Sequence, residues 1–494
     1  MSVFDLRQFN DRIALVDDRR EGLSYRELDD SVRQLGDLLP SGEKKLVFIL
    51  ARNNVETIVG YLMALQSGHC AMLLDANLDK AGVDILAQMY KPDFVWGPAA
   101  DKVAGSPRYG TYALTSIEGA SRMKLHPHLA LLLSTSGSTG SRKVVRLSAS
   151  NLISNARSIV DYLSLGETER PVAHLPVHYS YGLSIINSHL IVGATIFLTE
   201  TPVVRKEFWD FIRNGGVTSL AGVPYTFEML KRIGFSKMEL PTMRYLTQAG
   251  GKMNPETVAE VAKTCRHKNV NFFVMYGATE ATARMSYLPA AYAELKPGSI
   301  GVAIPGGVIR LLDDSGAAVT EPYQVGELVY VGPNVMMGYA VCRDDLSRGD
   351  DYGGVLPTGD LACFDEDGFY YISGRKNRFL KMLGKRFGLT DIEDHFESLG
   401  WKCICGGADD RLVVASHRDN HDRHNLTFKD IKKETCRKFK LPPDLVDVFL
   451  IEEIPRSPSG KIRYSDIFTN TIRREGVDDE WKSEGEGTVR QAGT

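Results

Sequence analysis

Short apolar runs alternate with longer segments of helical period along the first 300 residues. The run KLVFIL at 45–50 is typical of a strand buried on both faces. The segment NVETIVGYLMALQSG at 54–68 has the length of a helix and ends at a glycine. The same alternation predicts further strands at 171–176, 193–200, 217–224 and 271–277, and helices at 184–192 and 224–234. Strands that alternate with helices predict an α/β fold with mainly parallel sheet layered with helices.

The pattern changes near Gly298. Short apolar segments such as GELVYVGP (326–333) and GFYYISGR (368–375) then lie between turns rich in Gly, Pro and Asp, which is typical of a β-rich unit. Beyond Asn377 the chain again carries apolar strands and one basic helix. We therefore expect a core at 1–376 with a β-rich subdomain at 298–376, a small mobile α+β domain at 377–475, and a polar, flexible tail at 476–494.

Composition narrows the class of protein further. The 494 residues carry 59 Lys plus Arg against 62 Asp plus Glu, a net charge of −3 that gives no bulk attraction to nucleic acid or anionic membrane. No apolar run reaches 18 residues, and the first 20 residues are charged throughout, so neither a membrane span nor a signal peptide is expected. Seven scattered cysteines, an odd number, indicate a reduced cytoplasmic protein.

The first candidate for chemistry is STSGSTGSRK at 134–143, directly after an apolar strand. Gly137 and Gly140 permit a close backbone approach that a Cβ would block, and Lys143 supplies a positive charge. The hydroxyls between them could bind a polyphosphate; they belong to Thr135, Ser136, Ser138 and Thr139. The spacing differs from that of a Walker A loop, and a flexible Ser/Gly surface loop remains an alternative.

The second candidate is YGATEAT at 276–282, which follows the apolar strand at 271–277. Ligands of open α/β sheets bind at the carboxyl ends of strands. Glu280 could hold Mg²⁺, Thr279 could donate to a phosphate, and Tyr276 could stack on a base. A glutamate favoured by a helix N-terminus is the alternative interpretation.

Two more segments add candidates of lower specificity. In LPTGDLACFDEDGFYYISGR, Asp360 could accept from a ribose diol, Arg375 could add a donor, and FDEDG indicates a hairpin turn. Lys461 follows a Pro/Ser/Gly turn in PRSPSGKIRY. Taken alone, such a lysine is typical of a solvated turn.

The ordered set of these segments resembles the adenylate-forming superfamily of acyl-CoA synthetases, acyl and aryl acid ligases, peptide-synthetase adenylation domains and firefly luciferase. The resemblance runs from LSYREL at residue 23 to Lys461. The motifs that carry it are STSGSTGSRK, LPVHYSYGL, TQAGGKM, YGATEAT, GELVYVGPNVMMGY, TGD, GRKNRFLKMLGKR and PRSPSGK. Each motif is weak alone, whereas their common order is specific.

The resemblance implies a role for each matching residue. Residues 135–143 match the ATP phosphate loop, Glu280 the Mg²⁺ ligand, Thr279 a phosphate contact and Lys461 the catalytic lysine of the C-terminal domain. His178 matches the gate beside the acyl site. The walls of the adenine and acyl pocket and the ribose site are matched by Ala249, Gly250, Gly251, Tyr276, Gly277, Asp360, Ile372 and Arg375.

The implied activity is that of an ATP-dependent carboxylic acid ligase. The acid would become an acyl-adenylate with release of pyrophosphate, and then a thioester with CoA or a carrier-protein phosphopantetheine. Alternatives are an enzyme that stops at the adenylate, an acid–carrier-protein ligase, and a nucleotide-binding protein without turnover. The expected partners are a small acid and, for some members, an acyl carrier protein.

The substrate can be narrowed by one departure from the family. Members that activate amino acids carry an aspartate for the α-amine at a position near Ser180, and no acidic residue occurs between His178 and Asn187. We therefore expect an acid without an α-amino group. The pocket segments 178–188, 220–227 and 247–253 are mostly apolar and aromatic, with no obvious counter-charge beyond His178, which favours a medium-sized acyl or aryl acid.

A second departure concerns the hinge of the C-terminal domain. Asn377 stands where the family usually has Asp or Lys, and Asn tolerates unusual backbone angles. Because the family rotates this domain between its two half-reactions, Asn377→Pro is expected to spare adenylate formation and to block thioester formation. Separate assays of the two half-reactions test this prediction. If both proceed unchanged in the variant, Asn377 is not the hinge.

Overall fold

The computed structural model describes residues 4–19, 21–99, 107–117, 123–134, 143–376, 378–383, 385–456, 462–464 and 466–468. The described residues up to Lys376 form one compact unit, and those from Arg378 onward form a second. Asn377, assigned above to the hinge, lies outside the described residues. Each unit is described below by itself.

Two large sheets form the centre of the first unit. The strand order of sheet A is β16 (Val302–Ala303), β15 (Ser286–Leu288), β14 (Asn271–Tyr276), β13 (Tyr245–Gln248), β12 (Ser219–Gly222), β10 (Pro171–Ala173), β11 (Ile196–Leu198), β1 (Ile13–Val16) and β2 (Gly22–Ser24). The run from β14 to β1 is parallel, and β2, β15 and β16 are antiparallel additions.

Sheet B has a parallel centre and antiparallel edges. Its strand order is β19 (Gly338–Ala340), β9 (Val144–Ser148), β8 (Leu129–Ser134), β4 (Cys70–Asp75), β3 (Leu46–Ala51), β5 (Phe94–Pro98), β7 (Tyr112–Ser116) and β6 (Arg108–Tyr109). Strands β8 and β9 pair antiparallel up to Ser134 opposite Val144. The segment expected to bind phosphates therefore connects the two strands of a hairpin, whereas a Walker A loop leads from a strand into a helix.

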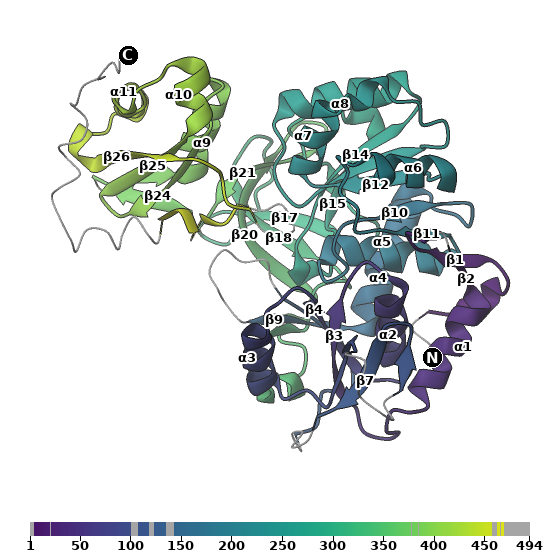
Figure 1. The fold of residues 1–494 in the computed structure, drawn as a ribbon. Helices are drawn as coiled ribbons and strands as arrows, with labels where there is room; N and C mark the ends of the chain where they lie inside the picture. Colours follow the sequence, from purple (N-terminus) through teal and green to yellow (C-terminus); the bar gives the residue numbers. More distant parts are fainter. Residues whose placement is uncertain are drawn as a thin grey trace, which may run out of the picture. The chain divides into compact units, whose positions relative to one another are not determined.

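Helices fill the space between the two sheets. They are α1 (Tyr25–Gly36), α2 (Val55–Gln66), α4 (Ala149–Leu163) and α5 (Ser180–Ile191) (Figure 1). Helix α5 packs on β10 and β11 of sheet A, α4 packs on β8 and β9 of sheet B, and the two helices contact each other. Helices α2 and α5 are buried on nearly every side, which explains why their sequences are apolar all round rather than striped.

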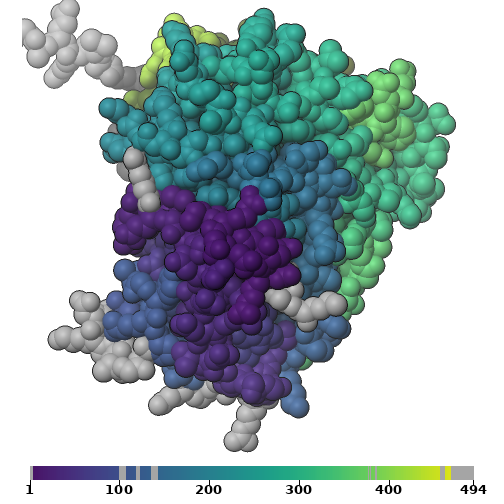
Figure 2. Space-filling view, turned by 90° about the vertical axis from the view of Figure 1, so that its right-hand side faces the viewer, coloured from purple at the N-terminus to yellow at the C-terminus, as the bar shows by residue number. Residues whose placement is uncertain are grey.

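The outer faces of the sheets carry the remaining helices of this unit, α3 (Lys80–Tyr90), α6 (Lys206–Gly215), α7 (Pro224–Arg232) and α8 (Pro255–His267). Helices α7 and α8 contact β12 and β14. Side chains cap several helix starts: Ser24 and Ser148 form capping boxes, and Asn54 accepts from the Thr57 amide. In the space-filling view (Figure 2), the N-terminal part of the chain, in purple, forms a continuous part of the surface of the molecule.

A third sheet completes the first unit. Its antiparallel order is β17 (Val308–Leu312), β18 (Gly326–Val331), β20 (Val355–Phe364) and β21 (Tyr370–Arg375). The turn between β20 and β21 confirms the hairpin expected at FDEDG. The turn is also tied down, since Lys296 Nζ lies 2.6 Å from Asp365 and 2.8 Å from Asp367.

The second unit has its own core. It contains the hairpin β22 (Phe379–Met382) and β23 (Lys385–Gly388), the sheet β24 (Cys403–Ala408), β25 (Arg411–His417) and β26 (Val446–Ile451), and the helices α9 (Leu389–Ser398), α10 (Arg418–His424) and α11 (Phe428–Phe439). The residues on the two sides of position 377 each form an ion pair within the unit to which they belong. Lys376 pairs with Glu327 at 2.7 Å, and Arg378 binds both carboxylate oxygens of Glu393 at 2.5 and 2.6 Å.

The architecture confirms the predicted α/β fold with parallel sheets layered with helices, a β-rich part and a small α+β unit. Each strand and helix predicted above from the apolar pattern has a counterpart of the expected type. The pattern did not show that the strands of the first unit divide between two sheets. Within the described residues, no helix is both long enough and apolar enough to span a bilayer.

Candidate active site

Three of the predicted residues meet at the carboxyl end of β14. The Tyr276 hydroxyl donates to Asp360 Oδ2, and Arg375 Nε lies 2.8 Å from Asp360 Oδ1. Asp360 and Arg375 are directly opposite each other in the β20–β21 ladder, which fixes this pair. Burial and, after it, the Asp360 carboxylate raise the pKa of Tyr276 well above its ordinary value, so its hydroxyl remains a donor. The Asp360 carboxylate, 5% exposed, retains lone pairs for further donors such as a ribose diol.

Glu280 lies four residues beyond Tyr276, in the one-turn helix η3 (Thr279–Ala281). Its Oε1 accepts from the Tyr339 hydroxyl at 2.8 Å, and no Lys or Arg among the described residues lies within ion-pair distance of it. Burial and then Glu280 raise the pKa of Tyr339, which keeps that hydroxyl protonated. Lys143 Nζ lies 3.9 Å from the centre of the Tyr339 ring. The end of the predicted phosphate segment and the predicted metal-binding carboxylate thus share one tyrosine.

A strained turn follows Glu280 immediately. Thr282 has φ 67° and ψ −54°, and the Ala283 amide donates to the Ala281 carbonyl at 2.7 Å, which together define a γ-turn with a positive central φ. This conformation is costly for a β-branched residue. Gly277 makes room for the turn, because a Cβ there would lie 1.8 Å from the Ala283 oxygen. Gly277, expected to bind the cofactor, therefore has a packing role in this structure.

Asn334 holds the strained turn in place. Its Nδ2 donates to the Ala281 carbonyl at 2.8 Å and to the Arg284 carbonyl at 3.1 Å, and its Oδ1 accepts from Tyr330 at 2.8 Å. The Thr282 hydroxyl donates to the Asn334 carbonyl at 2.7 Å. Asn334 is 2% exposed, so these bonds have no water to replace them. It acts as a positioning residue for Glu280.

We expect Asn334→Ala to impair both stability and magnesium use. Loss of the amide removes two hydrogen bonds to the turn and leaves the buried Tyr330 hydroxyl without its acceptor. This costs about 1–3 kcal/mol of unfolding free energy, and it releases the turn that orients Glu280. The magnesium concentration for half-maximal adenylation should rise. Asn420→Ala is the matched control, since Asn420 is fully buried and its amide donates to Lys402 O in the second unit. An equal lowering of stability in both variants, with unchanged magnesium dependence, would contradict the positioning role.

A cavity opens beside the same segment. It is lined by Tyr179, Ser180, Tyr181, Ala249, Gly250, Tyr276, Gly277, Ala278, Thr279, Ala283 and Arg284. Gly250 has φ +85°, and a Cβ there would lie 2.5 Å from the Tyr179 hydroxyl, so the turn after β13 needs glycine. Gln248 Nε2 fixes this turn by donating to the Gly251 carbonyl at 2.9 Å. The predicted pocket wall at 249–251 and the motif at 276–279 are thus brought together.

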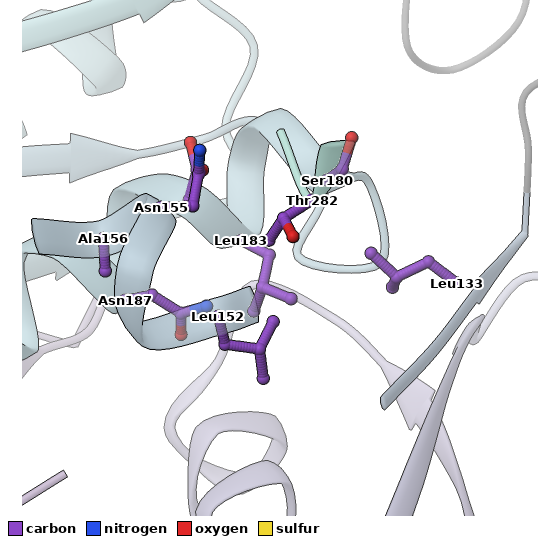
Figure 3. A pocket seen from close by; sticks show the side chains of 9 residues that line it. Leu133, Leu152, Asn155, Ala156, Ser180, Leu183, Asn187 and Thr282 are labelled. Atoms are coloured by element: carbon purple, nitrogen blue, oxygen red, sulfur yellow. The ribbon is translucent and has the colours of Figure 1, made fainter. Parts of the chain in front are cut away.

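A second, smaller cavity adjoins the helices between the sheets (Figure 3). Leucines from α4, α5 and β8 line it together with the polar side chains of Asn155, Ser180, Ser184, Asn187 and Thr282. Ser180 lines both cavities, and its hydroxyl lies 3.2 Å from the Thr279 hydroxyl. Thr279 is 7% exposed. Its predicted contact with a phosphate stays a prediction.

The structure adds a cation that the sequence interpretation missed. Arg284 lines the first cavity and is 3% exposed. The expectation of no counter-charge beyond His178 was limited to three pocket segments, and Arg284 lies outside them. Its signal in the sequence is a lone arginine in the apolar stretch between YGATEAT and β15, and nothing there says which way the side chain points.

His178 lies outside both cavity linings. Its Nε2 is 4.0 Å from Asp75 Oδ2, and burial lowers its pKa although Asp75 opposes this, so the ring is neutral at pH 7. Ile372 pairs with Ala362 in the third sheet and packs against the main core. Lys461 and the loop residues Thr135, Ser136, Gly137, Ser138, Thr139 and Gly140 lie outside the described residues. Their roles stay predictions.

Comparison with known proteins places this geometry in a family. The family model described as AMP-binding enzyme matches residues 5–340. A 2-succinylbenzoate–CoA ligase of Listeria monocytogenes is 26% identical over 467 residues, which are 91% of this chain and 94% of that protein. A 4-hydroxybutyrate–CoA ligase of Metallosphaera sedula is 29% identical over 56% of this chain and 50% of its own length.

Solved structures share the fold. O-succinylbenzoate coenzyme A synthetase (MenE) of Bacillus subtilis, in complex with AMP, has a TM-score of 0.75 at 21% identity and covers 94% of this chain and 97% of its own. ATP-bound MatB of Rhodopseudomonas palustris has a TM-score of 0.77 at 20% identity, with 96% of this chain and 100% of its own covered. The family model spans well over half of the sequence, and the chain belongs to the family of AMP-binding enzymes.

Proposed function

We propose that this protein is an AMP-forming acid–CoA ligase. It converts a carboxylic acid and ATP to an acyl-adenylate and pyrophosphate, and then transfers the acyl group to the thiol of CoA. The observation that carries this proposal is the segment Tyr276–Glu280. One end of it bonds Asp360 of the ribose pair, the other presents the Glu280 carboxylate, and the residues between them line the cavity.

The names of the relatives support the same reaction class. The matched curated proteins are 2-succinylbenzoate–CoA and 4-hydroxybutyrate–CoA ligases, which join an acid to CoA. MenE has been solved with the acyl-adenylate intermediate and with ATP and a magnesium ion. From these relatives we infer the reaction class and the nucleotide of this chain. The acid is inferred from the residues that line its own cavity.

The nucleotide would be held from two sides. Asp360 accepts from the ribose hydroxyls while Arg375 and Tyr276 hold its carboxylate. Phosphates would lie toward Lys143 and the loop residues 135–140, with the Thr279 hydroxyl as a further donor. His178 would border the acyl site as a neutral ring. The roles of the loop residues, Thr279 and His178 follow the family motif, and the geometry at the end of β14 supports the role of Asp360.

The residues present fit a magnesium ion at Glu280. Mg²⁺ binds through one or two carboxylates and otherwise through phosphates and water, and Glu280 offers a half-buried carboxylate with no cation paired to it among the described residues. When bound, the ion would offset negative charge on the phosphates. Tyr339 keeps the carboxylate oriented by donating to Oε1.

The first step needs no general base, because a carboxylic acid is already ionised at pH 7. A carboxylate oxygen attacks the α-phosphorus of ATP, the bond from that phosphorus to the bridging oxygen breaks, and pyrophosphate leaves with the electron pair. Both reactants are anions, so the protein must offset their repulsion. Lys461 would do so at the α-phosphate and Lys143 at the leaving pyrophosphate.

Exchange of labelled pyrophosphate into ATP, measured with a panel of fatty, aryl and amino acids, tests the first step. Thioester assays with either CoA or a phosphopantetheinylated carrier protein test the second step. We expect acid-dependent exchange with acids that lack an α-amino group, and thioester formation with CoA. Tight ATP binding without exchange by any acid of the panel would show a nucleotide-binding protein that lacks the reaction.

A further inference from the structure

The guanidinium of Arg284 is buried among neutral partners. Its Nε donates to the Ser184 hydroxyl at 3.2 Å, and its Nη1 donates to the Tyr162 hydroxyl at 2.8 Å and contacts Met275 Sδ at 3.4 Å. Its Cζ lies 5.3 Å from the centre of the Tyr181 ring. None of these groups carries a negative charge: the pKa values of Tyr162 and Tyr181 are raised by burial.

This arrangement differs from that of the other fully buried arginines. Arg146 lies 2.5 Å from Asp351, and Arg343 lies 3.1 Å from Asp93. Arg284 has no carboxylate within 4.0 Å among the described residues, although it is 3% exposed. A buried charge without a counter-charge is unfavourable, so a ligand that supplied the missing negative charge would stabilise this site.

The position of Arg284 identifies where that ligand would bind. Arg284 lines the cavity beside Gly250 and Thr279, and its acceptor Ser184 lines the neighbouring cavity. Its Nη2, which carries two N–H groups, makes no hydrogen bond to a described residue. A guanidinium offers a planar pair of donors that matches the two oxygens of a carboxylate.

We propose that the acid activated by this protein carries a second carboxylate, and that Arg284 binds it. This inference rests on the proposed function and names the substrate class of the same site. One carboxylate of the diacid reacts at the α-phosphate, while the other pairs with Arg284 in the cavity. An acid without the second charge leaves the guanidinium unpaired, and sites built to bind a polar group reject analogues that lack it.

Tyr162 and Met275 would keep the guanidinium in place for this task. The Tyr162 hydroxyl accepts from Arg284 and donates to Met275 Sδ at 3.0 Å, so its single proton is already committed. The Tyr162 ring is stacked on Tyr287 with ring centres 4.2 Å apart, which fixes its direction. Aromatic side chains from α4 and β15 thus fix the direction of the Arg284 guanidinium.

The test compares each dicarboxylic acid with its half-amide, which has nearly the same shape but lacks the distal charge. Pyrophosphate exchange is measured for aliphatic and aryl pairs, 2-succinylbenzoate among them. We expect the wild type to prefer the diacid of at least one pair by about 100-fold or more in kcat/KM. Arg284→Met should remove that preference by weakening diacid use while exchange with the half-amide is kept, and Arg284→Lys should retain part of it.

Arg343→Met is the matched control, because it also removes a buried arginine, whose partner Asp93 lies outside the cavity lining. It should lower the melting temperature more than Arg284→Met and leave the diacid preference unchanged. If Arg284→Met does not fold, the wild-type ratio and Arg284→Lys decide the question. Equal exchange with diacids and half-amides would overturn the inference and leave the proposed function intact. No exchange with any acid would overturn the proposed function and the inference with it.

Discussion

Substitution of Glu280 by glutamine is expected to slow adenylate formation by about 10²- to 10³-fold, the range seen when one preorganised group that stabilises transition-state charge is removed. Glutamine keeps the side-chain shape and an oxygen that can accept from Tyr339, so the fold should be preserved. What is lost is the charge that would bind magnesium. The rate of acid-dependent pyrophosphate exchange, measured over a range of magnesium concentrations, checks this prediction.

Two control variants separate charge from structure at this site. Tyr339→Phe removes the hydrogen bond but keeps the Glu280 charge, so it should have a much smaller effect than Glu280→Gln. Glu294→Gln removes a carboxylate from a surface pair with Arg266 and should have no effect on exchange. The magnesium role is excluded if Glu280→Gln shows the wild-type rate and the wild-type magnesium dependence.

Substitution of Lys461 by alanine is expected to lower the exchange rate by a similar factor, about 10²- to 10³-fold. Its ammonium would stabilise charge at the α-phosphate while the carboxylate attacks. The assignment rests on the motif PRSPSGK, because Lys461 lies outside the described residues. The variant should unfold at the same temperature as the wild type.

Lys438→Ala is a suitable comparison, since Lys438 is an exposed lysine of α11. It should leave pyrophosphate exchange unchanged. Exchange that persists in Lys461→Ala at the wild-type rate would remove Lys461 from the first half-reaction. An intermediate result, with exchange intact but thioester formation lost, would move its role to the second.

Most strands and helices could be predicted because apolar residues follow the pattern of burial in this protein. Strands such as β3 are covered on both faces and are apolar throughout, and the helix α2 that follows ends at a Ser–Gly pair. The division into two sheets could not be predicted, because β3 and β14 are similarly apolar. The sequence of either strand does not show which strands it pairs with. Pairing such as β1 with β11 joins segments about 180 residues apart.

The candidate site was predictable in part for a different reason. Tyr276, Glu280, Asp360 and Arg375 stand in motifs whose order is specific. Arg284 and Asn334 were missed because their partners are distant in the sequence: Tyr162 lies 122 residues from Arg284, and Ala281 lies 53 residues from Asn334. No local pattern indicates that a polar side chain will be buried beside a cavity or will hold a strained turn.

The product balance of one turnover with a diacid, ATP, magnesium and CoA decides whether the acid is activated as an adenylate. Chromatography of the nucleotides and thioesters, together with a pyrophosphate assay, gives all products at once. We expect equal amounts of AMP, pyrophosphate and acyl-CoA. Formation of ADP and phosphate in step with the thioester would contradict it, because the acid would then be activated at the γ-phosphate and not as an adenylate.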